Sequence, residues 1–328
     1  MQNSSPHLTS IDSISNQVLW KGAGYSDDDM SRPIIGIANS FSDMVPGHTN
    51  LRQVAQAAKN GIYRAGGTAA EFGVIACCDG LAAGHDGNNF VLPSRDNIAD
   101  SIEIIANAHR LDGLMLLGSC DKIVPGMLMA AARLDIPCIF VPGGCMLSGP
   151  AFAGQCKTDS TTVSEAMGSV QIGELEESDV IRLGGLVNPT CGSCQMMGTA
   201  NSMCCYAEAL GMTLTNGALI PAVYNERIRS AFASGEQIVE LVKRGITARQ
   251  IIDKKSIENA IMIMMAIGGS TNTVIHSCAI AHELGIEPGE IIRAFDELSD
   301  KIPCSRKSIR RLMTMTPRTC IWREACPR

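Results

Sequence analysis

Short apolar runs alternate with segments of helical periodicity as far as Pro150. Four runs predict buried strands, at 34–38, 72–77, 113–117 and 137–142. Three helices are predicted between them: 50–65, ending at Gly66-Gly67; 95–109, with Ser94 as its N-cap; and 127–134, with Pro125 and Gly126 at its start. Strands that alternate with helices predict an α/β fold, with a doubly wound, mostly parallel sheet flanked by helices.

After Pro150 the pattern becomes mostly helical, so we expect a helical second half. The predicted helices are 161–167, 174–183, 196–210, 237–243, 256–267, 273–284 and 288–298. The chain of 328 residues is long enough for one large or two ordinary domains. With 45% hydrophobic but only 4% aromatic residues, its core is expected to be aliphatic and rich in methionine.

Charge and cysteine content narrow the class of protein. The net charge of −6 argues against binding to nucleic acid. The sequence has 14 cysteines and a polar stretch at 1–13 in place of a signal peptide, which predicts a cytosolic or organelle-matrix protein with reduced thiols. Because 1–17 contains no Arg or Lys, a transit peptide is not expected, and we predict a cytoplasmic location. The longest apolar runs are shorter than the roughly 20 residues of a membrane-spanning helix, so no membrane association is expected.

Cys120, Asp121 and Lys122 follow one another in the turn after the predicted strand 113–117. Open α/β sheets bind ligands at the carboxyl ends of their strands. A thiolate is a good ligand for iron and a carboxylate for magnesium, and a lysine can be charged, neutralised or modified. From the tripeptide alone, a capped loop with a free cysteine and a solvated Asp-Lys pair is an equally good interpretation.

A second acid, Asp79, follows the predicted strand 72–77. Neighbouring strand ends converge in a doubly wound sheet, so Asp79 and Asp121 are candidates to share Mg²⁺ through their carboxylate oxygens. The alternative is that each aspartate caps the turn in which it lies, which is the commoner role of a lone Asp-Gly pair.

A Cys-x-x-Cys motif, from Cys191 to Cys194, stands ahead of a predicted helix. The adjacent pairs at 77–78 and 204–205 lack zinc spacing, and the motif does not follow an early strand as a thioredoxin-like pair would. Iron–sulfur ligation is therefore the best metal interpretation, and two small buried cysteines at a helix start are the alternative. The turn 268–273 is a further candidate, either for binding a carboxylate or phosphate or as an ordinary N-cap.

Taken together, these motifs resemble the dihydroxy-acid and phosphogluconate dehydratase family. Cys120-Asp-Lys-x-x-Pro-Gly-x-x-x-Ala130 is similar to its signature. Other matching segments are Asn39-Ser-Phe, Val45-Pro-Gly-His48, Cys78-Asp-Gly80, Leu92-Pro-Ser-Arg95, Ile98-Ala-Asp-Ser-Ile102, Pro189-Thr-Cys-Gly-Ser-Cys194, Thr199-Ala-Asn-Ser-Met203 and Gly268-Gly-Ser-Thr-Asn-Thr273. Their order fits from about 32 to 303, and the Val-Pro-Gly-His form is most similar to the dihydroxy-acid dehydratases of branched-chain amino-acid synthesis.

The resemblance implies a set of ligands. Cys120 and Cys194 would bind an iron–sulfur cluster of the 4Fe-4S or 2Fe-2S type. Asp79 and Asp121 would bind Mg²⁺, and Lys122, carbamylated by CO₂, would supply a third anionic oxygen ligand. Many relatives have a third cluster cysteine where this chain has Gly47, and the candidates to replace it are Cys191 and Cys78.

The resemblance also implies a reaction, the dehydration of small 2,3-dihydroxy-3-methyl carboxylates to 2-oxo acids in valine and isoleucine synthesis. Two alternatives remain, a sugar-acid dehydratase of the same family and a non-catalytic iron–sulfur protein. Full-length members of the family are expected to be homodimers.

We expect three regions: a lead-in at 1–31, a dehydratase N-terminal α/β domain at 32–304 and a basic tail at 305–328. The tail holds seven Lys/Arg and one acid, a net charge of +6, which leaves −12 for the rest of a chain whose net charge is −6. The family's C-terminal β-barrel domain supplies a Glu ligand to Mg²⁺ and a Ser base, and neither motif is found here. We hypothesise that a frameshift or premature stop replaced the natural continuation after Cys304, so we assign no catalytic base and expect no dehydration by this chain alone.

Overall fold

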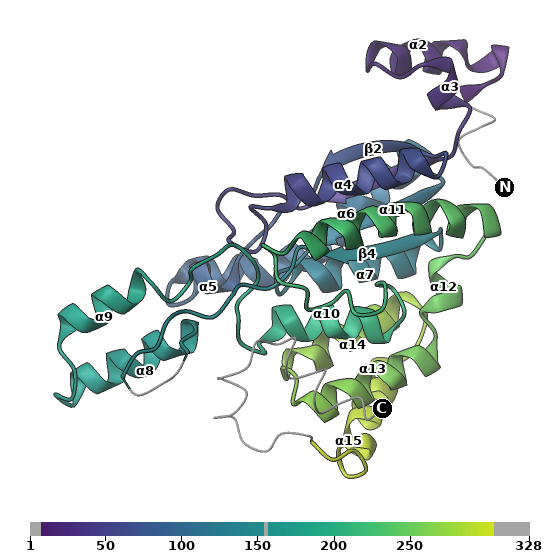
Figure 1. Ribbon diagram of the computed structural model, residues 1–328. Coiled ribbons are helices and arrows are strands. Elements are labelled where there is room, and N and C mark those ends of the chain that lie inside the picture. Colours follow the sequence, from purple (N-terminus) through teal and green to yellow (C-terminus); the bar gives the residue numbers. More distant parts are fainter. Residues whose placement is uncertain (1–7, 154–156, 305–328) are drawn as a thin grey trace.

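The computed structural model describes residues 8–153 and 157–304, and Figure 1 shows their arrangement. The predicted basic tail at 305–328 lies outside the described residues. Four parallel strands form one sheet in the order β2-β1-β3-β4: β1 (Ile34–Asn39), β2 (Thr68–Gly73), β3 (Gly113–Gly118) and β4 (Cys138–Pro142). Ile34 lies beside Thr68 on one side, and Ile35 lies beside Gly113 on the other. The direction of winding therefore reverses between β1 and β3.

Helices make up most of the rest of the described chain. In order they are η1 (Ile11–Ser13), α2 (Ile14–Gly22), α3 (Asp27–Met30), α4 (Leu51–Arg64), α5 (Asp79–Ala82), η2 (Asp86–Phe90), α6 (Val91–Ala108), α7 (Ile123–Leu134), α8 (Ser160–Gln171), α9 (Glu177–Gly184), α10 (Thr199–Ala209), α11 (Asn225–Arg244), α12 (Ala248–Ile251), α13 (Lys254–Ile267), α14 (Asn272–Glu283) and α15 (Pro288–Ser299). None of the described helices is both long and apolar enough to cross a membrane.

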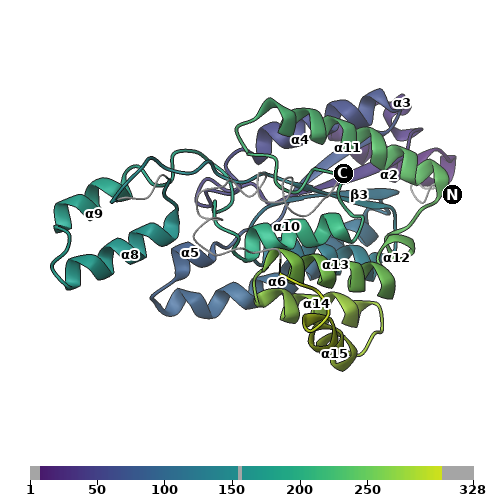
Figure 2. The ribbon, with the colours of Figure 1, turned by 60° about the horizontal axis from the view of Figure 1, so that its bottom comes forward.

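Both faces of the sheet are covered, as the alternation of side chains along β1 requires. Ile35 and Ile37 point toward α4 and α11 on one face, whereas Ile34 and Ala38 belong to the core formed with α6 and α7 on the other. The predicted doubly wound α/β class with parallel strands is confirmed for the described residues. The helical second half is confirmed as well, because α10, α13, α14 and α15 form a further layer outside α7 (Figure 2).

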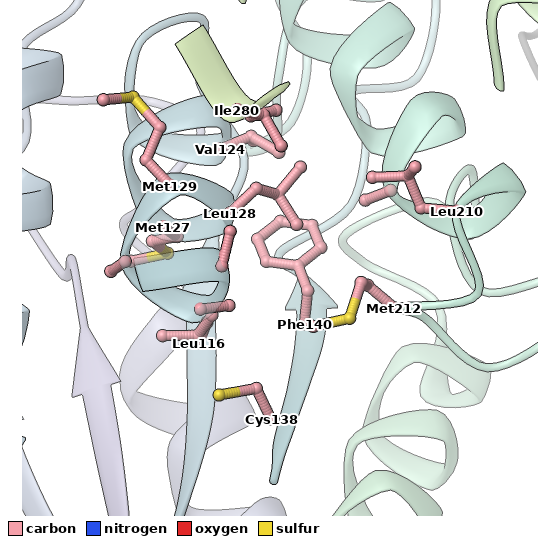
Figure 3. Packing of buried hydrophobic residues seen from close by; sticks show 14 of the residues in the cluster. Leu116, Val124, Met127, Leu128, Met129, Cys138, Phe140, Leu210, Met212 and Ile280 are labelled. Atoms are coloured by element: carbon pink, nitrogen blue, oxygen red, sulfur yellow. The ribbon is translucent and has the colours of Figure 1, made fainter. Parts of the chain in front are cut away.

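Phe140 of β4 joins the sheet to this outer layer. Figure 3 shows its ring directed toward Leu128 of α7, with Met212 beside it. Its backbone N–H donates to the Met212 carbonyl at 2.7 Å, and the Thr213 hydroxyl donates to the Phe140 carbonyl at 3.1 Å. The segment after α10 therefore covers the outer edge of β4, which would otherwise expose unpaired backbone groups.

A helical hairpin, α8 and α9, extends away from the body (Figures 1 and 2). It has a small core of its own, centred on Ala166, Leu183 and Val187. Its base is closed by an antiparallel bridge between Gly149 and Thr158. The chain thus leaves the sheet after β4, forms the hairpin and returns to the body at the Cys-x-x-Cys segment.

Several predicted boundaries were wrong. The helix predicted at 237–243 is the end of α11, which begins at Asn225, and the helix predicted at 127–134 begins at Ile123. The strand predicted at 72–77 lies at Thr68–Gly73 instead, because the chain turns from α4 directly into the register of β1. As an edge strand it is only partly buried, so its sequence is less apolar than that of a central strand and does not mark it clearly. Ser94 does not cap α6 but lies inside it, where its hydroxyl donates to the Val91 carbonyl at 2.6 Å. The helix starts earlier because η2 runs directly into it and Pro93 is tolerated in a first turn.

Helices α4 and α11 pack at unusually close range. A Cβ placed on Gly61 of α4 would stand 2.0 Å from the Phe232 carbonyl oxygen of α11. A Cβ on Gly235 of α11 would stand 2.3 Å from the Ala58 carbonyl oxygen. Both obstacles are backbone atoms, so they cannot be relieved by a change of rotamer. The two glycines therefore set the spacing of the helices that cover one face of the sheet.

We expect Gly61→Ala to lower the free energy of unfolding by about 1–3 kcal/mol, because the helices must separate or bend. This loss should exceed the gain of about 1 kcal/mol that alanine brings to a helix interior. Gly168→Ala in α8 is the matched control, because nothing lies within 4 Å of the added Cβ. Urea unfolding should show the control equal to or more stable than the wild type. Equal effects at the two positions would contradict the close approach.

Candidate functional site

The candidate site lies where the winding of the sheet reverses. Cys120, Asp121 and Lys122 follow directly on β3, and the loop after β1 carries Gly47 and His48. In open α/β sheets the loops at such a point diverge to opposite faces and leave room for a ligand. The structure therefore places the predicted tripeptide at the position that the fold itself favours for binding.

His48 holds the loop after β3 in place. Its side chain is completely buried, and Nδ1–H donates to the Ser40 carbonyl at 2.6 Å. Nε2 accepts the backbone N–H groups of Ser119 and Cys120, both at 3.2 Å. Burial lowers the pKa of His48 to about 4, so the imidazole is neutral and Nε2 has a free lone pair for these bonds. This one side chain thus satisfies backbone groups of both loops.

Lys122 joins the two predicted aspartates. Its Nζ lies 2.6 Å from Asp79 Oδ2 and 2.7 Å from Asp121 Oδ1, and only 5% of the residue is exposed. The other carboxylate oxygen of Asp79, Oδ1, is buried without a hydrogen-bond partner among the described residues. The structure therefore brings Asp79, Asp121 and Lys122 together as predicted, although β1 separates the strands that carry the aspartates.

The pKa values reflect this arrangement. Burial by itself would lower the pKa of Lys122, but its hydrogen bonds to Asp121 and Asp79 outweigh burial and raise it. Burial raises the pKa of Asp79, and Lys122 offsets only part of this effect. Burial also acts to raise the pKa of Asp121, but attraction by His276 and Lys122 prevails and lowers it. Asp121 is thus the more firmly ionised of the two carboxylates.

His276 of α14 is a neighbour of this group that the sequence did not predict. It is fully buried, and its Nε2 lies 3.6 Å from Asp121 Oδ1, slightly beyond hydrogen-bond range. Its Nδ1 lies 3.5 Å from Arg95 Nη1, and burial lowers its pKa. A lone histidine inside a helix carries no sequence signal, and only the packing of α14 on α7 shows its proximity to the tripeptide.

Of the two predicted cluster cysteines, Cys120 belongs to the tripeptide and Cys194 lies in the segment ahead of α10. The thiol of Cys120 is buried, and charge on Cys78 or Cys194 raises its pKa further, after the larger effect of burial. Cys194 is half-buried, and charge on Cys78 likewise raises its pKa. A Cβ placed on Gly47 would stand 2.7 Å from Cys120 Sγ. The loop after β1 therefore presses its backbone against this thiol.

The side chains at this site can be compared with those that metal ions and iron–sulfur clusters require. Among the described residues, no three His, Cys, Asp or Glu side chains lie close enough to hold a single metal ion. The oxygen donors are of the type that binds Mg²⁺, because the carboxylates of Asp79 and Asp121 both contact Lys122 Nζ. In addition, Asp79 Oδ1 has no hydrogen-bond partner among the described residues. The thiols fit a multi-iron cluster in kind, because a cluster is ligated by cysteines that need not meet at one atom.

The family model described as dihydroxy-acid/6-phosphogluconate dehydratase N-terminal matches residues 32–309, which is most of the chain. The chain belongs to the dihydroxy-acid/6-phosphogluconate dehydratase family. It is 50% identical over 294 residues to a dihydroxy-acid dehydratase of Caldanaerobacter subterraneus subsp. tengcongensis, and 50% identical over 288 residues to one of Methanoregula boonei. These matches cover 89% and 88% of this chain but only 52% of each relative, so the chain spans about half the length of these dehydratases.

A dihydroxy-acid dehydratase of Clostridium pasteurianum is 49% identical over 276 residues, which cover 84% of this chain and 96% of that relative. The resemblance inferred from the motifs is thereby confirmed at the level of the family. What the sequence motifs did not reveal is the role of His48 in the turn Pro46-Gly47-His48, because that role depends on two backbone N–H groups of a distant loop.

We expect His48→Leu to lower the free energy of unfolding by roughly 3 kcal/mol or more. Two N–H groups and one carbonyl lose their partner in the interior, and each unsatisfied group costs about 1–3 kcal/mol. His282→Leu, at an exposed position near the end of α14, is the control and should change stability by about 0.5 kcal/mol or less. Urea unfolding of both variants checks this, and a small effect at His48 would mean that the loops are held by other contacts.

Proposed function

We propose that this chain supplies the iron–sulfur and Mg²⁺ ligands of a dihydroxy-acid dehydratase. The reaction is the conversion of 2,3-dihydroxy-3-methyl carboxylates to 2-oxo acids in branched-chain amino-acid synthesis. The observation that carries the proposal is the meeting of two donor types at one strand end. Cys120 lies close enough to Cys194 for their charges to interact, and the two residues that follow Cys120, Asp121 and Lys122, form ion pairs with each other and with Asp79. The names of the relatives support the same substrate class.

In this proposal Asp79, Asp121 and Lys122 form the Mg²⁺ site. The ammonium of Lys122 now lies between the carboxylates, where it compensates their charge. Carbamylation of this amine by CO₂ would replace one positive charge with an anionic group. Three anionic groups would then repel one another at a half-buried point unless a divalent cation lay among them. Carbamylation and Mg²⁺ binding are therefore expected to depend on each other.

Cys120 and Cys194 hold the cluster in the same proposal. When bound, the cluster would supply Lewis acidity toward the C3 hydroxyl that leaves, and Mg²⁺ would neutralise the substrate carboxylate. The protein's own part is to fix the thiols and oxygens close together. His48 does this for the loop of Cys120, and the lysine–aspartate contacts do it for the loop of Asp79. We propose further that 32–304 is the domain that carries these ligands, with 1–31 as a lead-in.

Cys120→Ser and Cys194→Ser should each abolish the binding of iron and sulfide by anaerobically reconstituted protein, because both thiolates are proposed ligands. Cys278→Ser, at a half-buried position in α14, is the control and should retain both. Iron and acid-labile sulfide per chain and the visible charge-transfer bands measure the outcome. Unchanged iron content in the double Cys120/Cys194 variant would refute the cluster assignment.

Asp79→Asn and Asp121→Asn should each weaken Mg²⁺ binding, because an amide contributes no negative charge to the ion. Asp86→Asn alters a fully exposed carboxylate and should leave the affinity unchanged. Titration calorimetry with and without bicarbonate measures the affinity, and we expect tighter binding when Lys122 can be carbamylated. Wild-type affinity in both site variants would favour the alternative in which the aspartates only cap their turns.

The substrate class is tested on the loaded protein. Addition of 2,3-dihydroxy-3-methylbutanoate should perturb the visible and paramagnetic resonance spectra of the cluster, because its C3 hydroxyl would reach the open iron. Gluconate and 6-phosphogluconate should perturb them less. The reverse order would favour the sugar-acid dehydratases of the family, and no response to any of these acids would favour a non-catalytic iron–sulfur protein.

A further inference from the structure

Asn201, in the first turn of α10, connects this helix to the segment that carries Cys194. It is almost completely buried, with 1% of the residue exposed. Its Nδ2 donates to the backbone carbonyl of Cys194 at 2.6 Å and to that of Met196 at 2.8 Å. On the basis of the proposed function, in which Cys194 binds the iron–sulfur cluster, we propose that Asn201 is a positioning residue for this ligand.

The orientation of the Asn201 amide is determined by its neighbours. Its Oδ1 accepts the Ser193 hydroxyl at 2.7 Å, so the amide makes three hydrogen bonds in the interior. The opposite orientation would place the amide oxygen against two carbonyl oxygens, and none of the three could donate a hydrogen bond. One side chain of α10 thus binds Ser193, Cys194 and Met196 together.

The chain just ahead of the proposed ligand is held by backbone hydrogen bonds. The Gly192 N–H donates to the Pro46 carbonyl at 2.9 Å, in the loop after β1. The Ser193 N–H donates to the Gly144 carbonyl at 2.9 Å, and the Ser193 carbonyl accepts the Met146 N–H at 2.8 Å. These backbone bonds end at the residue before the proposed ligand.

From there to α10, side chains replace the backbone as hydrogen-bond partners. Among the described residues, no backbone-to-backbone hydrogen bond involves 194–197. The Gln195 side chain donates outward, to the Val187 carbonyl at 2.8 Å beside the α8–α9 hairpin. The carbonyls on either side of Gln195 accept from Asn201. Loss of the Asn201 amide would therefore free the segment on which Cys194 lies.

The position of this segment bears on cluster binding because the segment lies beside Cys120. A Cβ placed on Gly47 would stand 2.7 Å from Cys120 Sγ and 3.4 Å from the Ser193 backbone nitrogen. The thiol of one proposed ligand and the backbone that leads to the other therefore border the same small space. A cluster bound by both thiolates requires them to stay at a fixed separation. Outer residues that orient metal ligands in this way commonly change metal affinity about 10–100-fold.

The experiment compares anaerobically reconstituted wild type, Asn201→Ala and Ser202→Ala, with ferric iron and sulfide as the probe. Ser202 is the matched control because it is fully buried, follows Asn201 in α10 and accepts the Ser270 N–H at 2.9 Å, in a different segment. We expect Asn201→Ala to lose iron to a chelator at least about tenfold more readily than wild type, with altered visible charge-transfer bands. Ser202→Ala should retain iron as wild type does.

A milder variant, Ser193→Ala, decides the outcome if Asn201→Ala does not fold. It keeps the backbone bonds of Ser193 and removes the hydroxyl that orients the Asn201 amide. Its iron should be lost more readily than that of Ser202→Ala. Urea unfolding of the apo proteins measures the stability of each variant. If Asn201→Ala and Ser193→Ala both retain iron as firmly as Ser202→Ala, the positioning role is overturned while the cluster stands.

A second measurement uses the apo proteins, without iron or sulfide. They are treated with iodoacetamide, and the modified cysteines are located by mass spectrometry. Cys194 should react faster in Asn201→Ala than in wild type or Ser202→Ala, whereas Cys278 in α14 should react equally in all three. Equal reactivity of Cys194 in the three proteins would overturn the positioning role. If wild type takes up no iron and sulfide at all, the proposed function itself fails, and the positioning role fails with it.

Discussion

The buried ammonium of Lys122, held between two carboxylates, is the interaction on which the site depends. It lies at the end of β3 yet reaches Asp79, which belongs to a loop on the far side of β1. A buried charge that loses one partner is strongly destabilising, so neither loop can move independently of the other. The same contact holds Asp79 beside Lys122 and so brings the loop after β2 to the end of β3.

The neutral imidazole of His48 complements this charged contact. Its Nε2 accepts the N–H groups of Ser119 and Cys120 and so holds the backbone of the loop after β3. The side chain of Lys122 ties the same loop to Asp79. Behind both lies a tightly packed sheet, with the glycines of α4 and α11 allowing the helices to approach closely. Charge and hydrogen bonding therefore both restrain the same short segment, 119–122.

Much of this could be predicted from the sequence, and the exceptions have physical reasons. The central strands β1 and β3 are fully buried, so their apolar runs located them well. β2 is an edge strand with a mixed pattern, so it was displaced toward the more apolar segment that follows it. The grouping of Asp79 with Asp121 was predicted from converging strand ends. The participation of His276 was not, because it depends on how α14 packs in three dimensions.

The α8–α9 hairpin has a consequence for how this chain can vary. It carries its own small core and is closed at its base by the bridge between Gly149 and Thr158. Changes of length or sequence near its tip should therefore leave the packing of the body unchanged. Changes where the chain returns to the body should not be tolerated in the same way, because Ser193 forms a β-bridge with Cys145 and Cys194 is the next residue. A segment with a separate core of its own thus borders directly on Cys194, a proposed cluster ligand.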